Sequence, residues 1–260
     1  MRFSLFISAL LFFIATSATS MAQQPRQDYY ELRVYHYNGE DNELRLDNYF
    51  GKALVPALHR AGIKTVGVFK TSPADTAEKK FYVLIPYKSL QMIDKLETTL
   101  ESDNIYHTAG ADFLSTAYNN APFTRMEKII LKAFATRPHL RKPHLTGDKR
   151  SRIYELRSYE SPTMDMFRNK VKMFNDGDEV GIFDRLEFNP VFYSEVLSGS
   201  AMPNLMYMTS FENIESRDAH WKAFGADEQW NKLKANSEYD SHNVSHIDSR
   251  YLYPARYSDL

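Results

Sequence analysis

The sequence contains no cysteine at any of its 260 positions. This absence excludes disulfides, thiolate nucleophiles, zinc–thiolate sites and iron–sulfur clusters, whichever compartment the chain occupies. Excess charge of one sign is also lacking, because 32 basic side chains face 33 acidic ones and the formal net charge is −1. Without a global positive field, we do not expect nucleic acid as a partner.

Long apolar runs are confined to the N-terminus. Residues 3–15 follow Arg2 and are apolar except for two serines, and small side chains precede Gln23. This pattern is typical of a secretory signal peptide, here residues 1–22. The run is shorter than the roughly 20 apolar residues that cross a bilayer. We therefore expect cleavage, a periplasmic or extracellular location, and no membrane span in the mature chain.

Apolar side chains are nevertheless abundant, at 43% of the sequence, and aromatic residues make up 14%. Such a composition excludes disordered and fibrous classes and is sufficient for one large core or two small ones. No Ser-His-Asp arrangement, GxSxG, GxGxxG or phosphate-binding loop occurs in the chain. Known motifs therefore identify no catalytic residues in this sequence.

A hexapeptide occurs twice. Tyr30–Tyr35 reads YELRVY, and Tyr154–Tyr159 reads YELRSY 124 residues later. After each copy the sequence predicts a helix, two strands, a second helix and a final strand. We therefore expect two repeats, residues 28–136 and 153–257, joined by a basic linker at residues 137–152 that is rich in turn-forming residues.

The order strand-helix-strand-strand-helix-strand is that of the ferredoxin-like fold, an α+β class in which both helices cover one face of the sheet. The other face is bare. Two such sheets in one chain can bury their bare faces against each other and form a barrel with a central cavity. The alternative is two independent ferredoxin-like units on the linker.

Alternation along a strand gives the hexapeptide two faces. We assign the apolar set to the side beneath the helices and the polar set to the barrel interior. The polar set then converges from both halves and consists of Glu31, Arg33, Tyr35, Glu155, Arg157 and Tyr159.

Two interpretations of the polar set remain open. Buried charges must be paired, so each Glu–Arg pair could fix the register of the halves and bind nothing. Alternatively, some of these donors could hold an anionic or carbonyl ligand in the cavity, with arginine as a planar fork and tyrosine as a neutral donor.

Other candidates lie near the ends of the predicted elements. His36 follows the first hexapeptide and could act as a general base, whereas Glu160 occupies the matching place in the second half. Trp221 could line a cavity, while Phe224 and Trp230 are expected to pack in the core.

A metal site is considered at three other side chains. His242, His246 and Asp248 share an even spacing in a predicted strand, but a histidine pair of this spacing selects a metal on a helix. Without cysteine or an HExxH pattern to support it, we expect no metal there.

These motifs resemble the NIPSNAP family, in particular its secreted two-domain bacterial members. The resemblance rests on YYELRVY, ALVPALHRAGIKTVGVF and FYVLIPYKSL in the first half and on IYELRSY, LMYMTSF and HWKAF in the second. It covers nearly all of residues 28–257 and is most specific in the first half, because the AGI-x-x-VGVF signature is missing from the second. It implies a dimeric α/β-barrel type of fold formed within one chain, and no established catalytic motif.

Three functions follow as hypotheses. The leading one is an exported protein that binds a small apolar ligand with a polar head in the barrel, without a resident cofactor. The alternative is a cofactor-independent oxygenase, isomerase or lyase with His36 or a glutamate as base, and haem held by a histidine or tyrosine is a sub-case. The third is an interaction module with a filled barrel. Pairing of whole barrels into a homo-oligomer is left open.

Overall fold

The computed structural model describes residues 26–72 and 79–260. The predicted signal peptide, residues 1–22, lies outside these residues. Across the two described ranges, no helix combines the length and the apolar character that a membrane crossing requires.

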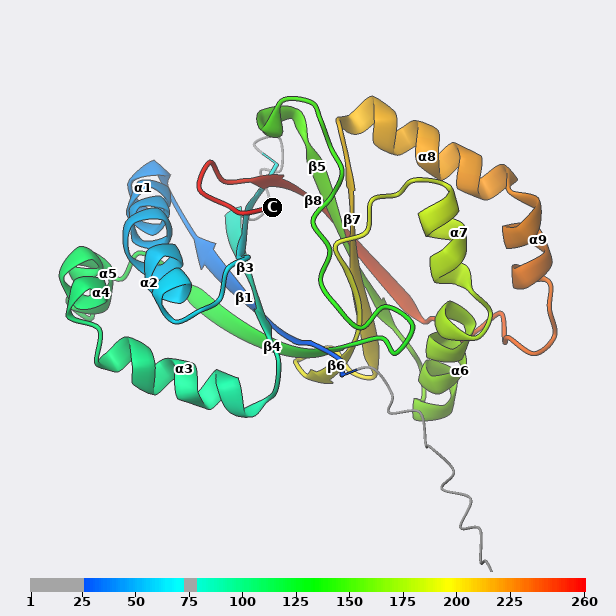
Figure 1. The fold of residues 1–260 in the computed structure, drawn as a ribbon, viewed down its shortest axis with the longest axis horizontal. Coiled ribbons are helices and arrows are strands. Elements are labelled where there is room, and N and C mark those ends of the chain that lie inside the picture. The colour runs from blue at the N-terminus through cyan, green and yellow to red at the C-terminus, as the bar shows by residue number, and fades with distance from the viewer. Residues whose placement is uncertain (1–25, 73–78) are drawn as a thin grey trace, which may run out of the picture.

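Eight antiparallel strands close into a barrel (Figure 1). Their order around the barrel is β1-β3-β2-β8-β5-β7-β6-β4, so each half contributes four neighbouring strands. The first half supplies β1 (Tyr29–Tyr37), β2 (Gly67–Thr71), β3 (Lys79–Tyr87) and β4 (Arg125–Ala133). The second half supplies β5 (Ile153–Glu160), β6 (Phe192–Ser198), β7 (Asn204–Phe211) and β8 (His246–Pro254). The halves meet where β2 pairs with β8 and where β4 pairs with β6.

Helices cover the barrel from two opposite sides (Figure 1). On one side lie α1 (Glu40–Asn48), α2 (Val55–Arg60), α3 (Gln91–Glu101), α4 (Asn104–Ala109) and α5 (Ala111–Leu114), with a π-helical turn at Tyr49–Leu54 between α1 and α2. On the other side lie α6 (Met164–Asn175), α7 (Glu179–Arg185), α8 (Ile214–Ala226) and α9 (Glu228–Lys234). A short 3-10 turn at Lys149–Ser151 precedes β5.

The predicted helices are present, but two of them are divided. Asp103 accepts a hydrogen bond from the backbone N–H of Tyr106 and caps α4, which separates it from α3. Asp227 caps α9 in the same way through the N–H of Trp230, which separates it from α8. Gly62, at φ +91°, follows α2, where glycine adopts the left-handed conformation without strain.

Equivalent elements begin at the same spacing in both halves. The starts of β1 and β5, of α1 and α6, and of α2 and α7 are each separated by 124 residues. The two hexapeptides also pair with the third strand of their own half in the same register, since Glu31 lies opposite Ile85 and Glu155 opposite Thr209. A position in the first half can therefore be compared directly with its counterpart in the second.

The predicted faces of the hexapeptides are reversed in the structure. Tyr30, Leu32 and Val34 share one apolar cluster with Tyr154 and Leu156 from the opposite half, and this cluster lies inside the barrel. The Glu-Arg-Tyr sets face outward beneath the helices. Both faces of these strands are buried, so the apolar pattern alone did not distinguish the inside of the barrel from the helix side. The charged set lies where helical side chains can pair with it.

The barrel is packed at one end. Tyr30 lies 5.3 Å from the Phe192 ring, and Phe69 lies 4.8 Å from the Tyr154 ring, measured between centroids. All four rings are at least 98% buried. These residues come from the beginnings of β1 and β5 and their neighbours, so the cavity is confined to the other end, where β1 and β5 finish.

Candidate functional site

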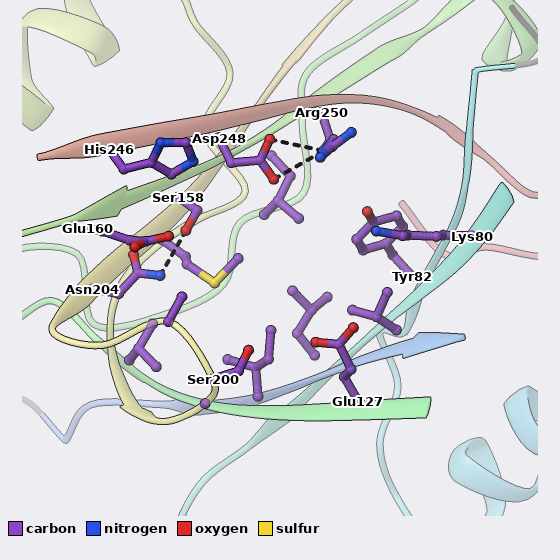
Figure 2. Close-up of a pocket in the computed structure, with 18 residues that line it drawn as sticks. Lys80, Tyr82, Glu127, Ser158, Glu160, Ser200, Asn204, His246, Asp248 and Arg250 are labelled. Atoms are coloured by element: carbon purple, nitrogen blue, oxygen red, sulfur yellow. Dashed lines mark hydrogen bonds and ion pairs between the residues drawn. The ribbon is translucent and has the colours of Figure 1, made fainter. Parts of the chain in front are cut away.

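A cavity of about 370 Å³ occupies the open end of the barrel (Figure 2). We call it the barrel cavity. Its inner wall is apolar and is formed by strands from both halves; it comprises Leu32, Val34, Ile129, Leu156, Val196 and Met206. A volume of this size lies within the range of small-molecule sites in proteins.

Polar side chains surround the mouth of this cavity. His246, Asp248 and Arg250 reach it from β8, because every second residue of a strand shares a face. Figure 2 shows Glu160 beside them, with Lys80 and Tyr82 across the cavity. The mouth therefore presents cationic and anionic groups together.

Some of the mouth residues are already held by neighbours. The Arg250 Nε donates to Asp248 Oδ2 at 3.0 Å, and the Asn204 side-chain amide donates to the Ser158 hydroxyl at 2.8 Å (Figure 2). These contacts orient the side chains before any ligand arrives, which reduces the entropy lost on binding.

Glu160 lies at this mouth, and His36 is connected to it through Glu127. Glu160 lines the cavity, whereas the His36 Nε2 lies 2.6 Å from Oε1 of Glu127, which also lines it. The two positions that match in sequence thus carry a carboxylate and a carboxylate-paired imidazole. Such groups can accept or donate a proton to a bound molecule.

The histidines considered for metal binding are separated in the structure. His246 and Asp248 line the barrel cavity, but His242 lies in an exposed turn before β8, with its Nδ1 3.1 Å from Asp240 Oδ1. Within residues 26–72 and 79–260, no three histidine or carboxylate side chains are placed to share a metal ion.

The first polar cluster lies between β1 and α3. Glu31 is fully buried and accepts from Arg33 at 2.8 and 3.1 Å and from the Tyr87 hydroxyl at 2.8 Å. Burial opposes ionisation, yet the Arg33 charge and these hydrogen bonds hold the pKa of Glu31 below its ordinary value. Glu97 of α3 accepts a further bond from Arg33 at 3.3 Å.

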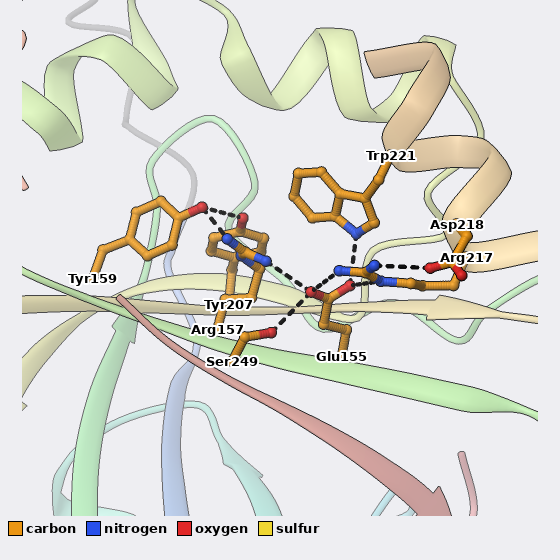
Figure 3. A network of polar contacts seen from close by, with 8 residues as sticks. All are labelled: Glu155, Arg157, Tyr159, Tyr207, Arg217, Asp218, Trp221 and Ser249. Atoms are coloured by element: carbon orange, nitrogen blue, oxygen red, sulfur yellow. Dashed lines mark hydrogen bonds and ion pairs between the residues drawn. The ribbon is translucent and has the colours of Figure 1, made fainter. Parts of the chain in front are cut away.

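The second polar cluster lies between β5 and α8 (Figure 3). Glu155 accepts from Arg157 at 2.7 Å, from Arg217 at 2.8 and 2.9 Å, from the Trp221 indole at 2.6 Å and from the Ser249 hydroxyl at 2.9 Å. Burial again opposes ionisation, but the two guanidiniums and the indole hold the pKa of Glu155 below its ordinary value.

The tyrosines of the hexapeptides are bound into the same layers. The Tyr159 hydroxyl lies 2.9 Å from that of Tyr207 and accepts from the Arg157 Nε at 3.1 Å. Tyr35 packs edge-on against Phe50, and burial raises its pKa to about 12.

In the structure, each Glu–Arg motif thus forms an ion pair. It also separates all six residues of the predicted polar set from the barrel cavity. The cavity is instead lined by the alternate residues of the same strands, such as Leu32, Leu156 and Ser158. The alternation of residues along these strands indicates which side chains share a face. The prediction that the polar face lines the barrel interior was wrong.

A second hollow lies outside the barrel, between the second sheet and its helices. We call this hollow, of about 580 Å³, the helix cleft. Trp221, a candidate for a cavity wall from sequence, lines this hollow and not the barrel cavity. Phe224 and Trp230 pack in the core, as expected, and at the same time form part of the wall of the helix cleft.

Comparisons with known proteins agree with this architecture. A provisionally assigned monooxygenase from Lactobacillus acidophilus NCFM superposes with a TM-score of 0.57 at 11% identity, covering 88% of this chain and 94% of that one. One from Fusobacterium nucleatum gives 0.56 at 7% identity, covering 89% and 94%. An anthrone oxidase-like protein gives 0.52 at 8% identity, covering 89% and 92%. At such identities the likeness concerns the fold alone.

The sequence comparisons are narrower. No curated protein matches the chain. The NIPSNAP family model matches residues 154–259, which span the second half from the hexapeptide to the end of β8 and beyond. The matched region is the second half, whose motifs are less specific than those of the first half. The second half of the chain is therefore similar to the NIPSNAP family.

Proposed function

We propose that this protein binds a small molecule with an apolar body and a polar head in the barrel cavity. The observation that carries the proposal is the cavity itself: about 370 Å³ enclosed by strands of both halves, apolar within and polar at its mouth. Convergence of a few polar groups on an apolar hollow is the usual form of a small-molecule site.

The lining indicates how such a ligand would lie. Leu32, Leu156 and Met206 offer contacts for the apolar body, and its burial supplies most of the binding free energy. The head would reach His246 and Glu160 at the mouth. Because the mouth contains both signs of charge, a hydroxylated or zwitterionic head fits better than a simple anion.

Three further inferences concern the repeats, the location of the protein and the source of the ligand. The two halves are tandem ferredoxin-like repeats, supported by the 124-residue spacing of equivalent elements, with the unit boundaries expected from sequence. The chain is exported, on the evidence of its N-terminal sequence. The ligand is therefore a molecule available outside the inner membrane rather than a cytosolic nucleotide.

The test is native mass spectrometry of the protein purified from its own host, followed by extraction of any bound molecule. Val196→Phe places a ring in the barrel cavity and should abolish co-purification. Val244→Phe makes the same change in the helix cleft and should leave it intact. Full-length protein that carries no molecule, or a molecule retained by Val196→Phe, would contradict the proposal.

A second candidate is a cofactor-independent oxygenase, isomerase or lyase acting in the same cavity. It is favoured by Glu160, His246 and the His36–Glu127 pair beside open volume, which could move a proton. The extracted ligand should be converted by the protein under air only if the reaction is an oxygenation, and under both air and nitrogen if it is an isomerisation or an elimination. Glu160→Gln should slow conversion without preventing binding. If the ligand remains unchanged, the protein binds it without converting it. A filled-barrel interaction module is disfavoured by the open cavity.

A further inference from the structure

The helix cleft is separate from the barrel cavity. It opens between α6, α7, α8, α9 and the residues that lead into β8, on the opposite face of the second sheet from the barrel. Its wall is largely aromatic. The Phe224 ring contacts those of Trp221 and Trp230, with centroid distances of 5.5 and 4.6 Å.

A buried ion pair stands at the floor of this cleft. Lys170 Nζ lies 3.0 Å from Glu179 Oε2, and the two side chains are only 7% and 3% exposed. The ammonium also lies 4.9 Å from the centroid of the Phe174 ring and 5.9 Å from that of Trp230. Both charged residues line the cleft.

The first half shows that the fold does not need this pair. Because α1 and α6 start 124 residues apart, as do α2 and α7, the counterpart of Lys170 is Leu46 and that of Glu179 is Val55. Leu46 and Val55 are core residues, 0% and 4% exposed. A buried ion pair is generally no more stabilising than a well-packed apolar pair at the same place. The charges of the second half therefore call for a role other than stability.

The space around these positions also differs between the halves. In the first half, Tyr49 stacks on Phe113 of α5 at 3.7 Å, and its hydroxyl meets that of Tyr106 at 2.7 Å. In the second half, Met173 occupies the place of Tyr49, and residues 235–245 form turns where the first half has α5. The aromatic rings that fill the helix layer of the first half are thus absent from these positions in the second half, where the helix cleft lies.

We propose that the helix cleft is a second binding site, which takes a flat, uncharged aromatic molecule bearing a carbonyl or similar acceptor oxygen. The ring system would pack against Trp221 and Trp230. The oxygen would accept a hydrogen bond from the Lys170 ammonium. This site is independent of the function proposed for the barrel cavity.

The hydrogen-bonding capacity of Lys170 supports the acceptor. An ammonium has three N–H donors. In the part of the chain that the structure describes, one is directed at Glu179 and one makes a weak 3.4 Å contact with the Met173 sulfur. One donor therefore remains for a ligand. The charge of Glu179 balances that of Lys170, which favours a neutral ligand over an anion.

The experiment uses Prodan, a neutral naphthalene that carries a ketone, as the probe. The sequence contains only two tryptophans, Trp221 and Trp230, and both line the helix cleft. Their emission therefore reports directly on this site in the full-length protein. We expect saturable one-to-one quenching, with energy transfer from the tryptophans to the bound probe. Absence of saturable quenching would overturn the proposal.

Variants separate this site from the alternatives. The Lys170→Leu/Glu179→Val double variant copies the residues of the first half and should bind Prodan at least about tenfold more weakly, the loss of one hydrogen bond to a charged donor. Val244→Phe should block the cleft, which keeps the test decisive if the double variant does not fold. Val196→Phe, in the barrel, should bind normally. Equal affinity in the double variant, or in Val244→Phe, would refute the site.

Discussion

The two helix layers of this molecule cover equivalent sheets with different interiors. In the first half, Leu46 and Val55 belong to a closed core with Tyr49 and its stacked Phe113. In the second half, the same frame carries a buried ion pair and a cleft of about 580 Å³. The difference shows that the strands and first helices set the frame, whereas a few side chains decide whether a layer is packed or hollow.

The two buried carboxylates differ in a related way. Glu31 accepts three hydrogen bonds, from Arg33 and Tyr87. Glu155 accepts five, because Arg217 and Trp221 of α8 reach it in addition to Arg157 and Ser249. The second half therefore anchors its long helix through charge, where the first half relies more on apolar packing.

The largest effects are expected at the buried ion pair. Lys170→Leu or Glu179→Val alone leaves an unpaired charge in the core and should lower the free energy of unfolding by about 3–5 kcal/mol. The double variant should be neutral or more stable by about 1–4 kcal/mol, as replacement by an apolar pair often is. Urea unfolding measures all three. Additive losses in the double variant would contradict the comparison with the first half.

The reciprocal change tests the same comparison from the other side. Leu46→Lys places an unpaired ammonium in the packed first layer and should also cost about 3–5 kcal/mol. Adding Val55→Glu should recover part of that loss if the two frames are equivalent. A Leu46→Lys variant of unchanged stability would show that the first layer is not closed.

The two carboxylates should respond unequally to neutralisation. Glu155→Gln deprives two arginines of their charged acceptor and should cost about 3 kcal/mol or more. Glu31→Gln should cost about 2 kcal/mol, because a single arginine, Arg33, bonds to Glu31, and Lys128 Nζ lies farther away at 3.5 Å. Thermal and urea unfolding of the two variants provide the comparison, and an equal or reversed order would refute it.

The pH dependence of stability should have opposite signs at two carboxyls. Burial opposes ionisation of Glu155, but its arginines lower its pKa. The carboxylate therefore contributes to the stability of the fold above the ordinary carboxyl pKa. This contribution is lost as pH falls through the lowered pKa. Burial raises the pKa of Glu179. The folded state then holds the proton more tightly, and stability falls as pH rises from the ordinary value through the raised one.

Unfolding free energies measured against pH would reveal both signs. Glu155→Gln should reduce the loss of stability on the acid side, and Glu179→Gln should reduce the decline above the ordinary carboxyl range. The slope is the readout, because each variant also shifts the absolute stability. Profiles parallel to that of the unchanged protein would contradict the assignment.

The smallest effects are expected at the ends of α2 and α7. Gly62 follows α2 at φ +91°, and Glu187 occupies the corresponding place after α7 at φ 56°. Glycine adopts this left-handed conformation without strain, so Glu187→Gly should stabilise by about 1 kcal/mol and Gly62→Ala should destabilise by about the same amount. Thermal unfolding measures both; a loss of stability in Glu187→Gly would contradict the reasoning.

Much of the frame could be predicted from sequence. The helix α6 after the second hexapeptide could be predicted, because its apolar spacing indicates a helix. The faces of β1 and β5 could not be predicted, since both sides of these strands are buried. Lys170 and Glu179 were not singled out either, although comparison with Leu46 and Val55 at the repeat spacing would have found them.

The most direct test of the contrast between the two layers is a crystal structure of the full chain with Prodan bound. The account predicts electron density for the probe between Trp221 and Trp230, with the ketone oxygen within hydrogen-bonding distance of Lys170 Nζ, and none in the aromatic layer around Tyr49. Density in the first layer, or a helix cleft that stays closed by its own side chains at saturating probe, would contradict it.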